Sequence, residues 1–221
     1  MWADSDMFNS MRGEDSVPRP APGEELNLGP QTAPRQAATV ILLRGNERAL
    51  EVLLVQRSQQ ARFMAGVWVF PGGAVEPEEL EQPDPHMLAA RRELREEAGI
   101  ELPAQAELIE LSRWITPAIV KVRFDTVFFL AQLPDGQQAK VDGNECVDHR
   151  WCSPAQALET YASGEMPLVF PTIKHLEAIA PFASAAELIE RSRGQPIEAV
   201  QPKVIMDSGS PRVVLPGEPG Y

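Results

Sequence analysis

The chain has 221 residues, with 20 Lys and Arg against 32 Asp and Glu, so its formal net charge at pH 7 is −12. This acidic balance argues against nucleic-acid binding, because neutralising phosphates requires a surplus of basic residues on the surface. No apolar run approaches the roughly 20 residues of a membrane span, and the N-terminus lacks the basic start and apolar stretch of a signal peptide. We therefore expect a cytoplasmic protein that binds neither nucleic acid nor membrane.

Composition divides the chain into three parts. Residues 1–35 are rich in proline and acidic residues and have no apolar pattern, which predicts a flexible arm. Residues 36–195 contain regular apolar patterns, and the 43% of apolar residues in the chain suffices for a core. Residues 196–221 are again rich in proline, but short apolar runs flank the turn sequence DSGSP. This pattern favours an ordered β-hairpin over a loose tail.

Strand and helix signals alternate irregularly along the central part. Ser153 followed by Pro154 predicts the start of a helix that ends near residue 163. A Gly-Gly turn and an acidic loop are expected between residues 72 and 84. This mixture of elements predicts an α/β sandwich with a mixed sheet. Apolar runs predict strands at 38–43, 51–57, 67–70, 107–116, 122–132 and 147–151, and helical periodicity returns at 171–180 and 184–193.

A helix over residues 85–98 carries the most informative side chains. Asp84 and Pro85 stand at its expected N-cap and first position, and Gly99 at its end. Carboxylates spaced i, i+3 and i+4 fall on one helical face and repel one another. A hard, oxygen-seeking cation such as Mg²⁺ or Mn²⁺ would relieve that repulsion, whereas a solvated acidic face is the alternative interpretation. The glutamates with this spacing are Glu93, Glu96 and Glu97.

The segment from Phe70 to Ile100 resembles the Nudix box, which ends in Arg-Glu-apolar-x-Glu-Glu-x-Gly-apolar. Residues 92–100 match this second half without exception, which makes the motif specific. In the first half Gly73 and Glu79 keep the five-residue gap, but twelve residues instead of seven separate Glu79 from Arg92. The role of Glu79 is therefore left open.

The resemblance implies a Nudix-type α/β/α sandwich that hydrolyses a nucleoside diphosphate derivative with the help of divalent cations. It assigns the metal-ligand role to Glu93, Glu96 and Glu97, and a catalytic role to Glu96 and Arg92. Arg92 would orient the carboxylates by ion pairing, although an ordinary surface salt bridge is the alternative.

A second pattern lies upstream, where LLVQRS at 53–58 precedes Arg62, Gly66 and the sequence FPGG at 70–73. It is similar to the signature of coenzyme A diphosphatases within the Nudix family, with Val55 in place of a threonine. Arg57 and Arg62 would offer forked positive charges to phosphates, or they are ordinary basic residues at a strand end. The substrate-binding residues implied by the resemblance are Arg57, Ser58, Arg62, Gly66, Phe70, Gly72 and Gly73.

Glu145 precedes the strand expected at 147–151. We nominate it as a further acidic residue of the site. It would complete the metal site or accept a proton from water, with a solvated loop acid as the alternative. Cys146 and Cys152 are expected to be buried thiols. The three histidines show no ligand spacing and receive no role.

The sequence thus leads to one functional hypothesis and two alternatives. The hypothesis is metal-dependent hydrolysis of coenzyme A or acyl-coenzyme A to 3′,5′-ADP and 4′-phosphopantetheine products. The alternatives are a Nudix hydrolase for ADP-ribose, NADH or a dinucleotide, and a nucleotide-binding module without catalysis. The expected partner is a small nucleoside diphosphate substrate, and a homodimer is compatible with the sequence.

Overall fold

The computed structural model of the chain describes residues 27, 29–45, 49–61, 63–207 and 210–221. The strands of its main sheet are β1 (Arg35–Arg44), β2 (Glu51–Arg57), β3 (Trp68–Val69), β4 (Gly72–Ala74), β5 (Ile109–Ile115), β6 (Phe124–Gln132), β7 (Cys146–Cys152) and β8 (Ala199–Val200). Within these described ranges, eight strands form one sheet in the order β3-β2-β1-β6-β5-β8, while β4 pairs with β1 and β7 with β2. The central strands β1 and β6 are parallel, and β1–β2 and β5–β6 are antiparallel. The sheet is therefore mixed, as predicted.

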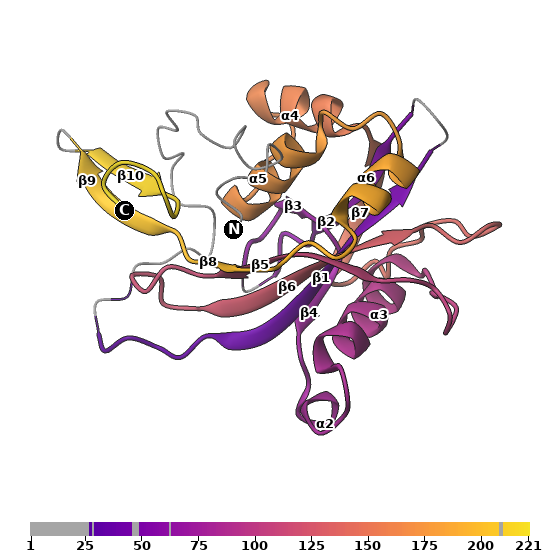
Figure 1. Cartoon of the computed structure of the whole chain (residues 1–221), viewed down its shortest axis with the longest axis horizontal. Helices are drawn as coiled ribbons and strands as arrows, with labels where there is room; N and C mark the ends of the chain where they lie inside the picture. Colours follow the sequence, from indigo (N-terminus) through magenta and orange to yellow (C-terminus); the bar gives the residue numbers. More distant parts are fainter. Residues whose placement is uncertain (1–26, 28, 46–48, 62, 208–209) are drawn as a thin grey trace.

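Helices cover both faces of the sheet, with α3 on one side and α4, α5 and α6 on the other (Figure 1). Their bounds are α2 (Pro77–Leu80), α3 (Pro85–Ala98), α4 (Pro154–Ala162), α5 (Phe170–Ile179) and α6 (Ala185–Ser192). Leu94 of α3 packs in one apolar cluster with Val40 and Phe129 of the sheet. Leu176 of α5 packs in a second cluster with Ile41. Two apolar layers on opposite faces of one sheet confirm the predicted α/β/α sandwich, and none of the described helices is long and apolar enough to cross a membrane.

Helix α3 begins and ends where the sequence predicts. Asp84 is its N-cap residue, Pro85 its first residue and Gly99 its C-cap. Gly99 has a φ of +66°, in the left-handed region that favours glycine, and its N–H donates to the carbonyls of Leu94 and Arg95. Asp84 departs from the expected capping chemistry, because its φ is +56° and its side chain makes no capping hydrogen bond.

The segment between β3 and α3 is more regular than predicted. Gly72 and Gly73 do not form an isolated turn but belong to β4, where they pair with Thr39 and Ala38 of β1. The expected acidic loop contains the short helix α2, whose first turn is closed by reciprocal bonds between Glu76 and Glu79. Both elements depend on contacts between pairs of residues, those of the two glycines with β1 and that of Glu76 with Glu79. Turn signals read from single residues do not show such contacts.

The two ends of the described chain lie against the sheet domain. Most of the predicted N-terminal arm lies outside the described residues. The part that is described contacts the loop between β5 and β6, since the N–H of Asn27 donates to the Ile119 carbonyl at 2.7 Å. At the other end, β9 (Lys203–Asp207) and β10 (Ser210–Val214) pair antiparallel. Leu215 then enters the apolar cluster under α4, α5 and α6.

His175 on α5 is fully buried against aromatic rings of that cluster, those of Phe70, Trp114 and Phe128. Its Nδ1 lies 2.6 Å from the Pro171 carbonyl oxygen, and its Nε2 lies 2.6 Å from the Ser112 hydroxyl. Because a carbonyl can only accept, we assign the proton to Nδ1, and Nε2 accepts from Ser112. The ring stacks on Phe128 with 4.1 Å between centroids. Burial lowers the pKa of His175 to about 4, so the core holds the neutral ring.

This histidine should make the fold sensitive to acid. The unfolded chain takes up a proton near pH 6.5 and the folded chain only near pH 4, so the stability that the neutral ring supplies is present above pH 6.5 and is lost below it. We expect the free energy of unfolding to fall by about 2 kcal/mol from this group between pH 7 and pH 5, measured by urea denaturation. His175→Asn should remove this contribution, so its stability relative to the wild type should rise by about 2 kcal/mol on going from pH 7 to pH 5. His149→Gln should show no such change. An unchanged dependence of stability on pH in His175→Asn would contradict the assignment.

Candidate active site

Two glycines of β4 allow the α3 carboxylates to reach the sheet backbone. The N–H of Gly72 donates to Oε2 of Glu97 at 2.9 Å. A Cβ added to Gly72 would lie 2.5 Å from the Ala38 carbonyl oxygen, and one added to Gly73 would lie 2.3 Å from Oε1 of Glu93. Any side chain at either position would therefore displace backbone or a carboxylate. The absence of a side chain at both positions therefore allows the close approach of β4 to β1 and α3.

Glu97 is the most buried acid of the site, with 2% of its surface exposed. Burial raises its pKa to about 8, and the charges of Glu93 and Glu145 add to this effect. The Gly72 N–H and the Arg57 guanidinium oppose the rise without cancelling it. The pKa of Glu93 is also raised, first by burial and then by repulsion from Glu145 and Glu96. Several carboxylates thus lie within electrostatic range of one another and are short of positive charge.

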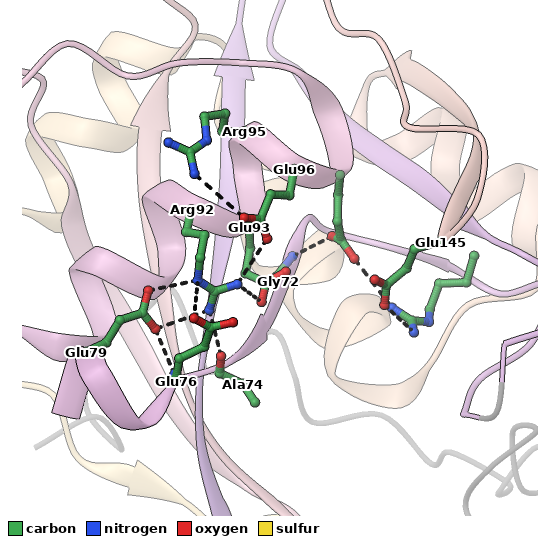
Figure 2. Close-up of polar contacts among 11 residues, drawn as sticks. Gly72, Ala74, Glu76, Glu79, Arg92, Glu93, Arg95, Glu96 and Glu145 are labelled. Carbon is green, nitrogen blue, oxygen red and sulfur yellow. Dashed lines mark hydrogen bonds and ion pairs between the residues drawn. The ribbon is translucent and has the colours of Figure 1, made fainter.

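Arg92 is the side chain that holds the α3 carboxylates in place. Figure 2 shows its guanidinium among Glu79, Glu93 and Glu96, with the Ala74 carbonyl of β4 beside it. Nη1 lies 2.6 Å from Oε1 of Glu93 and 3.2 Å from Oε2 of Glu96, and Nη2 lies 2.9 Å from the Ala74 oxygen. The bonds to Glu79 and then to Glu93 raise the pKa of Arg92 further above its usual range. The predicted role of Arg92, which is to orient the carboxylates, requires contacts of this kind.

Glu79 belongs to the site in spite of the longer spacing that separates it from Arg92. Its Oε1 accepts from Nε of Arg92 at 2.9 Å, and its Oε2 from Nη2 at 3.1 Å. Burial alone would raise the pKa of Glu79, but the Arg92 bonds and the Glu76 N–H outweigh it and lower the pKa. Because α2 folds back against α3, the five extra residues lengthen the loop without removing this contact. The sequence left this role open.

Arg57 does not stand free for a substrate phosphate in this structure. Its Nη2 lies 3.0 Å from Oε1 of Glu145, and its Nη1 lies 3.5 Å from Oε1 of Glu97. Its Nε donates to the Phe63 carbonyl at 3.3 Å. The structure therefore brings together the predicted substrate residue Arg57 and two of the predicted site acids, from β2, α3 and the loop before β7.

The loop that carries Glu145 is organised by Asp142, a residue that the sequence analysis missed. The Asp142 carboxylate accepts from the backbone N–H groups of Asn144, Glu145 and Cys146 at 3.0, 2.9 and 2.8 Å. Burial would raise the pKa of Asp142, but these bonds prevail and lower it. The Glu145 carbonyl also accepts from the N–H of Ser58 at 2.8 Å, which joins the loop to the end of β2. The run Asp142-Gly143-Asn144 is a turn signal that could have found this residue.

The remaining predicted substrate residues are spread around this centre. Ser58 and Gly66 lie in the turn after β2, where the N–H of Gly66 donates to the Arg57 carbonyl at 3.1 Å. Phe70 is buried in the apolar cluster under α5 and not in the cluster that packs against α3. Arg62 lies outside the described residues. Both cysteines are buried free thiols, as predicted.

The donor set has the chemistry that a hard divalent cation needs. Carboxylate oxygens are the ligands that Mg²⁺ and Mn²⁺ prefer. Burial first, and repulsion from neighbouring carboxylates second, raise the pKa values of Glu93 and Glu97, and a bound cation would offset both effects. In the part of the chain that the structure describes, no three acidic, histidine or cysteine side chains already stand in a metal-binding arrangement. Arg57 and Arg92 pair with the carboxylates instead. The predicted ligands Glu93, Glu96 and Glu97, together with Glu145, could hold an ion after their side chains reorient. Glu96 pairs with Arg92 and Arg95 in this structure.

Removing the Asp142 carboxylate should loosen the turn before β7. Asp142→Ala leaves three backbone N–H groups without their acceptor, so we expect a loss of about 1 kcal/mol in the free energy of unfolding. Hydrogen exchange should show faster exchange of the backbone amides of residues 144–146. Asp135→Ala, which changes an exposed acid of the same loop, is the matched control. Equal exchange rates in the two variants would show that Asp142 does not organise the turn.

Comparisons with known proteins identify the family. Residues 33–172 match the NUDIX domain family model. The chain is 27% identical to putative nudix hydrolase 7 of Caenorhabditis elegans over 66% of this chain, and 31% identical to human acyl-coenzyme A diphosphatase NUDT19 over 50% of it. These matches span 60% and 31% of the two relatives. The chain is also 33% identical to CTP pyrophosphohydrolase of Escherichia coli, over 56% of this chain and 82% of that protein.

The fold has a counterpart among solved structures. A NUDIX hydrolase from Alicyclobacillus acidocaldarius superposes with a TM-score of 0.66 and 26% sequence identity, over 75% of this chain and 99% of that protein. Residues 33–172, which the family model matches, contain strands β1 to β7, α3 and the carboxylates described above. With the family model covering more than half of its length, the chain belongs to the NUDIX domain family.

Proposed function

We propose that this protein is a metal-dependent hydrolase that cuts the diphosphate of coenzyme A or an acyl-coenzyme A, giving 3′,5′-ADP and 4′-phosphopantetheine products. The hydrolase assignment rests on one observation: the carboxylates of Glu93, Glu97 and Glu145 converge near the glycines of β4. Arg92 holds one side of that cluster and Arg57 the other. The diphosphate of the substrate and the carboxylates are both negatively charged. The substrate can therefore bind beside them only if cations lie between the two.

Two observations support coenzyme A as the substrate class. The human relative carries the name acyl-coenzyme A diphosphatase, and the spacing of Arg57, Gly66 and Phe70 resembles the coenzyme A signature. Val55, which departs from that signature, is fully buried in the cluster between the sheet and α3. Its side chain packs in the core, so the departure does not remove a group from the surface that a substrate would contact.

The chain's own residues would divide the reaction among them. Divalent cations, when bound, polarise the phosphoryl oxygens and lower the pKa of a water molecule. Glu93, Glu96 and Glu97 would hold them from α3 together with one oxygen of Glu145. Arg92 fixes the position of Glu93. An Oε of Glu145 would take the proton as the water oxygen bonds to phosphorus and the bridging P–O bond breaks. The leaving phosphate carries away the electron pair of that bond.

A second candidate substrate class is a free nucleotide. The Escherichia coli relative is named CTP pyrophosphohydrolase, and the match covers most of its length. Both classes share the diphosphate and differ in the group attached to it, so the carboxylates serve either one.

A substrate panel separates these candidates. Purified protein with Mg²⁺ or Mn²⁺ would be given coenzyme A, acyl-coenzyme A esters, ADP-ribose, NADH, dinucleoside polyphosphates and CTP, with products measured by chromatography. We expect kcat/KM for a coenzyme A compound to exceed that for every other class by about tenfold or more, a difference of about 1.4 kcal/mol in transition-state binding. A preference for another class would refute the coenzyme A assignment. Inactivity on every compound would refute the hydrolase assignment.

Glu97→Gln should separate catalysis from stability. A folded-state pKa of about 8 against 4.5 in the unfolded chain means that folding disfavours the ionised form, so this group lowers stability increasingly as pH rises from 4.5 to 8. At pH 7, without divalent cations, we expect the neutral variant to be about 1–3 kcal/mol more stable by urea denaturation. Its turnover should fall by roughly three orders of magnitude or more, because a ligand charge is lost.

The exposed Glu101, just beyond α3, offers a matched control. Glu101→Gln should change neither the stability nor the turnover. Wild-type turnover in Glu97→Gln would contradict the role of Glu97 as a cation ligand, whatever its stability.

A further inference from the structure

Arg57 occupies a position that the proposed function gives to a cation. Its guanidinium lies between Glu145, at 3.0 Å, and Glu97, at 3.5 Å. The Arg57 side chain has 16% of its surface exposed, and that of Glu97 only 3%. An arginine thus supplies, inside the cluster, part of the positive charge that these two acids need.

Arg57 and a divalent cation would compete for the same oxygens. The second oxygen of Glu97 already accepts from the Gly72 N–H at 2.9 Å, so Oε1, which faces Arg57, is the one left for another partner. A guanidinium and a divalent cation on the Glu97 carboxylate would repel each other, and the burial of Arg57 and Glu97 limits the screening by water. A bound cation would therefore push Arg57 away from Glu97 and Glu145.

Arg57 is better suited to such a change than Arg92. Arg92 makes bonds of 2.6–3.2 Å to Glu79, Glu93, Glu96 and the Ala74 carbonyl, which fix it on several sides. The contacts of Arg57 are 3.0–3.5 Å long. An arginine cannot lose its charge, so once displaced it needs another anion, and its planar fork matches a phosphate.

We propose that Arg57 exchanges partners: it pairs with Glu97 and Glu145 until a divalent cation takes these carboxylates, and it then binds the diphosphate of the substrate. This inference rests on the proposed function, since it takes the cation and the diphosphate from there. Its consequence is that cation binding and diphosphate binding strengthen each other, because the cation releases the residue that the diphosphate requires. Such coupling is reciprocal by thermodynamic necessity.

Binding measurements test the exchange without following turnover. Mn²⁺ affinity would be measured from the signal of free Mn²⁺ by electron paramagnetic resonance, and the affinity for methylenediphosphonate, a non-hydrolysable diphosphate, by calorimetry with and without Mn²⁺. In wild-type protein, Mn²⁺ should tighten diphosphonate binding about fivefold or more. Arg57→Met should bind Mn²⁺ alone about fivefold more tightly, since its competitor is gone, yet lose most of the gain in diphosphonate affinity.

Arg193→Met is the matched control, because Arg193 also bridges two carboxylates, those of Glu107 and Glu190, far along the chain from the site. It should bind both ligands as the wild type does. If Arg57→Met binds Mn²⁺ no more tightly than the wild type, or keeps the full gain in diphosphonate affinity, the exchange is wrong.

A second measurement avoids the variant altogether. In wild-type protein labelled with ¹⁵N, the Nε–H resonance of Arg57 should shift on addition of Mg²⁺ and shift again on addition of methylenediphosphonate. An Arg57 resonance that responds to neither ligand would overturn the exchange. If wild-type protein binds Mn²⁺ and cleaves a diphosphate substrate but the Arg57 resonance does not shift, the exchange is refuted and the proposed function stands. Wild-type protein that binds no Mn²⁺ would refute both.

Discussion

The burial of the Glu97 carboxylate is the constraint around which the site is arranged. An ionised carboxylate with 2% exposure is costly unless other groups compensate for the lost water. The chain supplies a backbone N–H from Gly72 and a guanidinium from Arg57, and both fall short, since the pKa of Glu97 still rises to about 8. Such a group lowers the stability of the isolated fold. Its presence in a cluster of further acids is understandable if a cation completes the site, because natural proteins accept instability where function needs it.

The register of the sheet decides which charges meet. Arg57 ends β2 and stands opposite Cys146 of β7 in the antiparallel ladder, so Glu145, one residue earlier, lies beside Arg57. Gly72 pairs with Thr39 of β1, and this places β4 under the carboxylates of α3. A slip of one residue in either ladder would send the side chains to the other face. The geometry of the acids is therefore fixed by strand pairing as much as by the helix.

Local signals predicted the parts of the site that are local. The bounds of α3 follow from Pro85 and Gly99, and the common face of its glutamates follows from helical spacing. The partners of Arg57 lie 40 and 88 residues away, and no local pattern places them. The local sequence of Gly72 and Gly73 likewise predicts a turn, because nothing in it shows that β1 lies beside them. Glu79 was left open because sequence spacing does not show that α2 folds back onto Arg92.

The carboxylate cluster cannot by itself choose a substrate. Coenzyme A, ADP-ribose and a free nucleotide all present the same phosphate bridge, so they differ only in groups that lie beyond it. Under the proposed function those groups would meet the turn after β2, where Gly66 has a φ of +74° and its N–H donates to the Arg57 carbonyl. This turn follows directly on Arg57, the residue that contacts Glu97 and Glu145. A change of specificity should therefore need changes in this turn and none in α3, because the carboxylates act only on the phosphate bridge that all these substrates share.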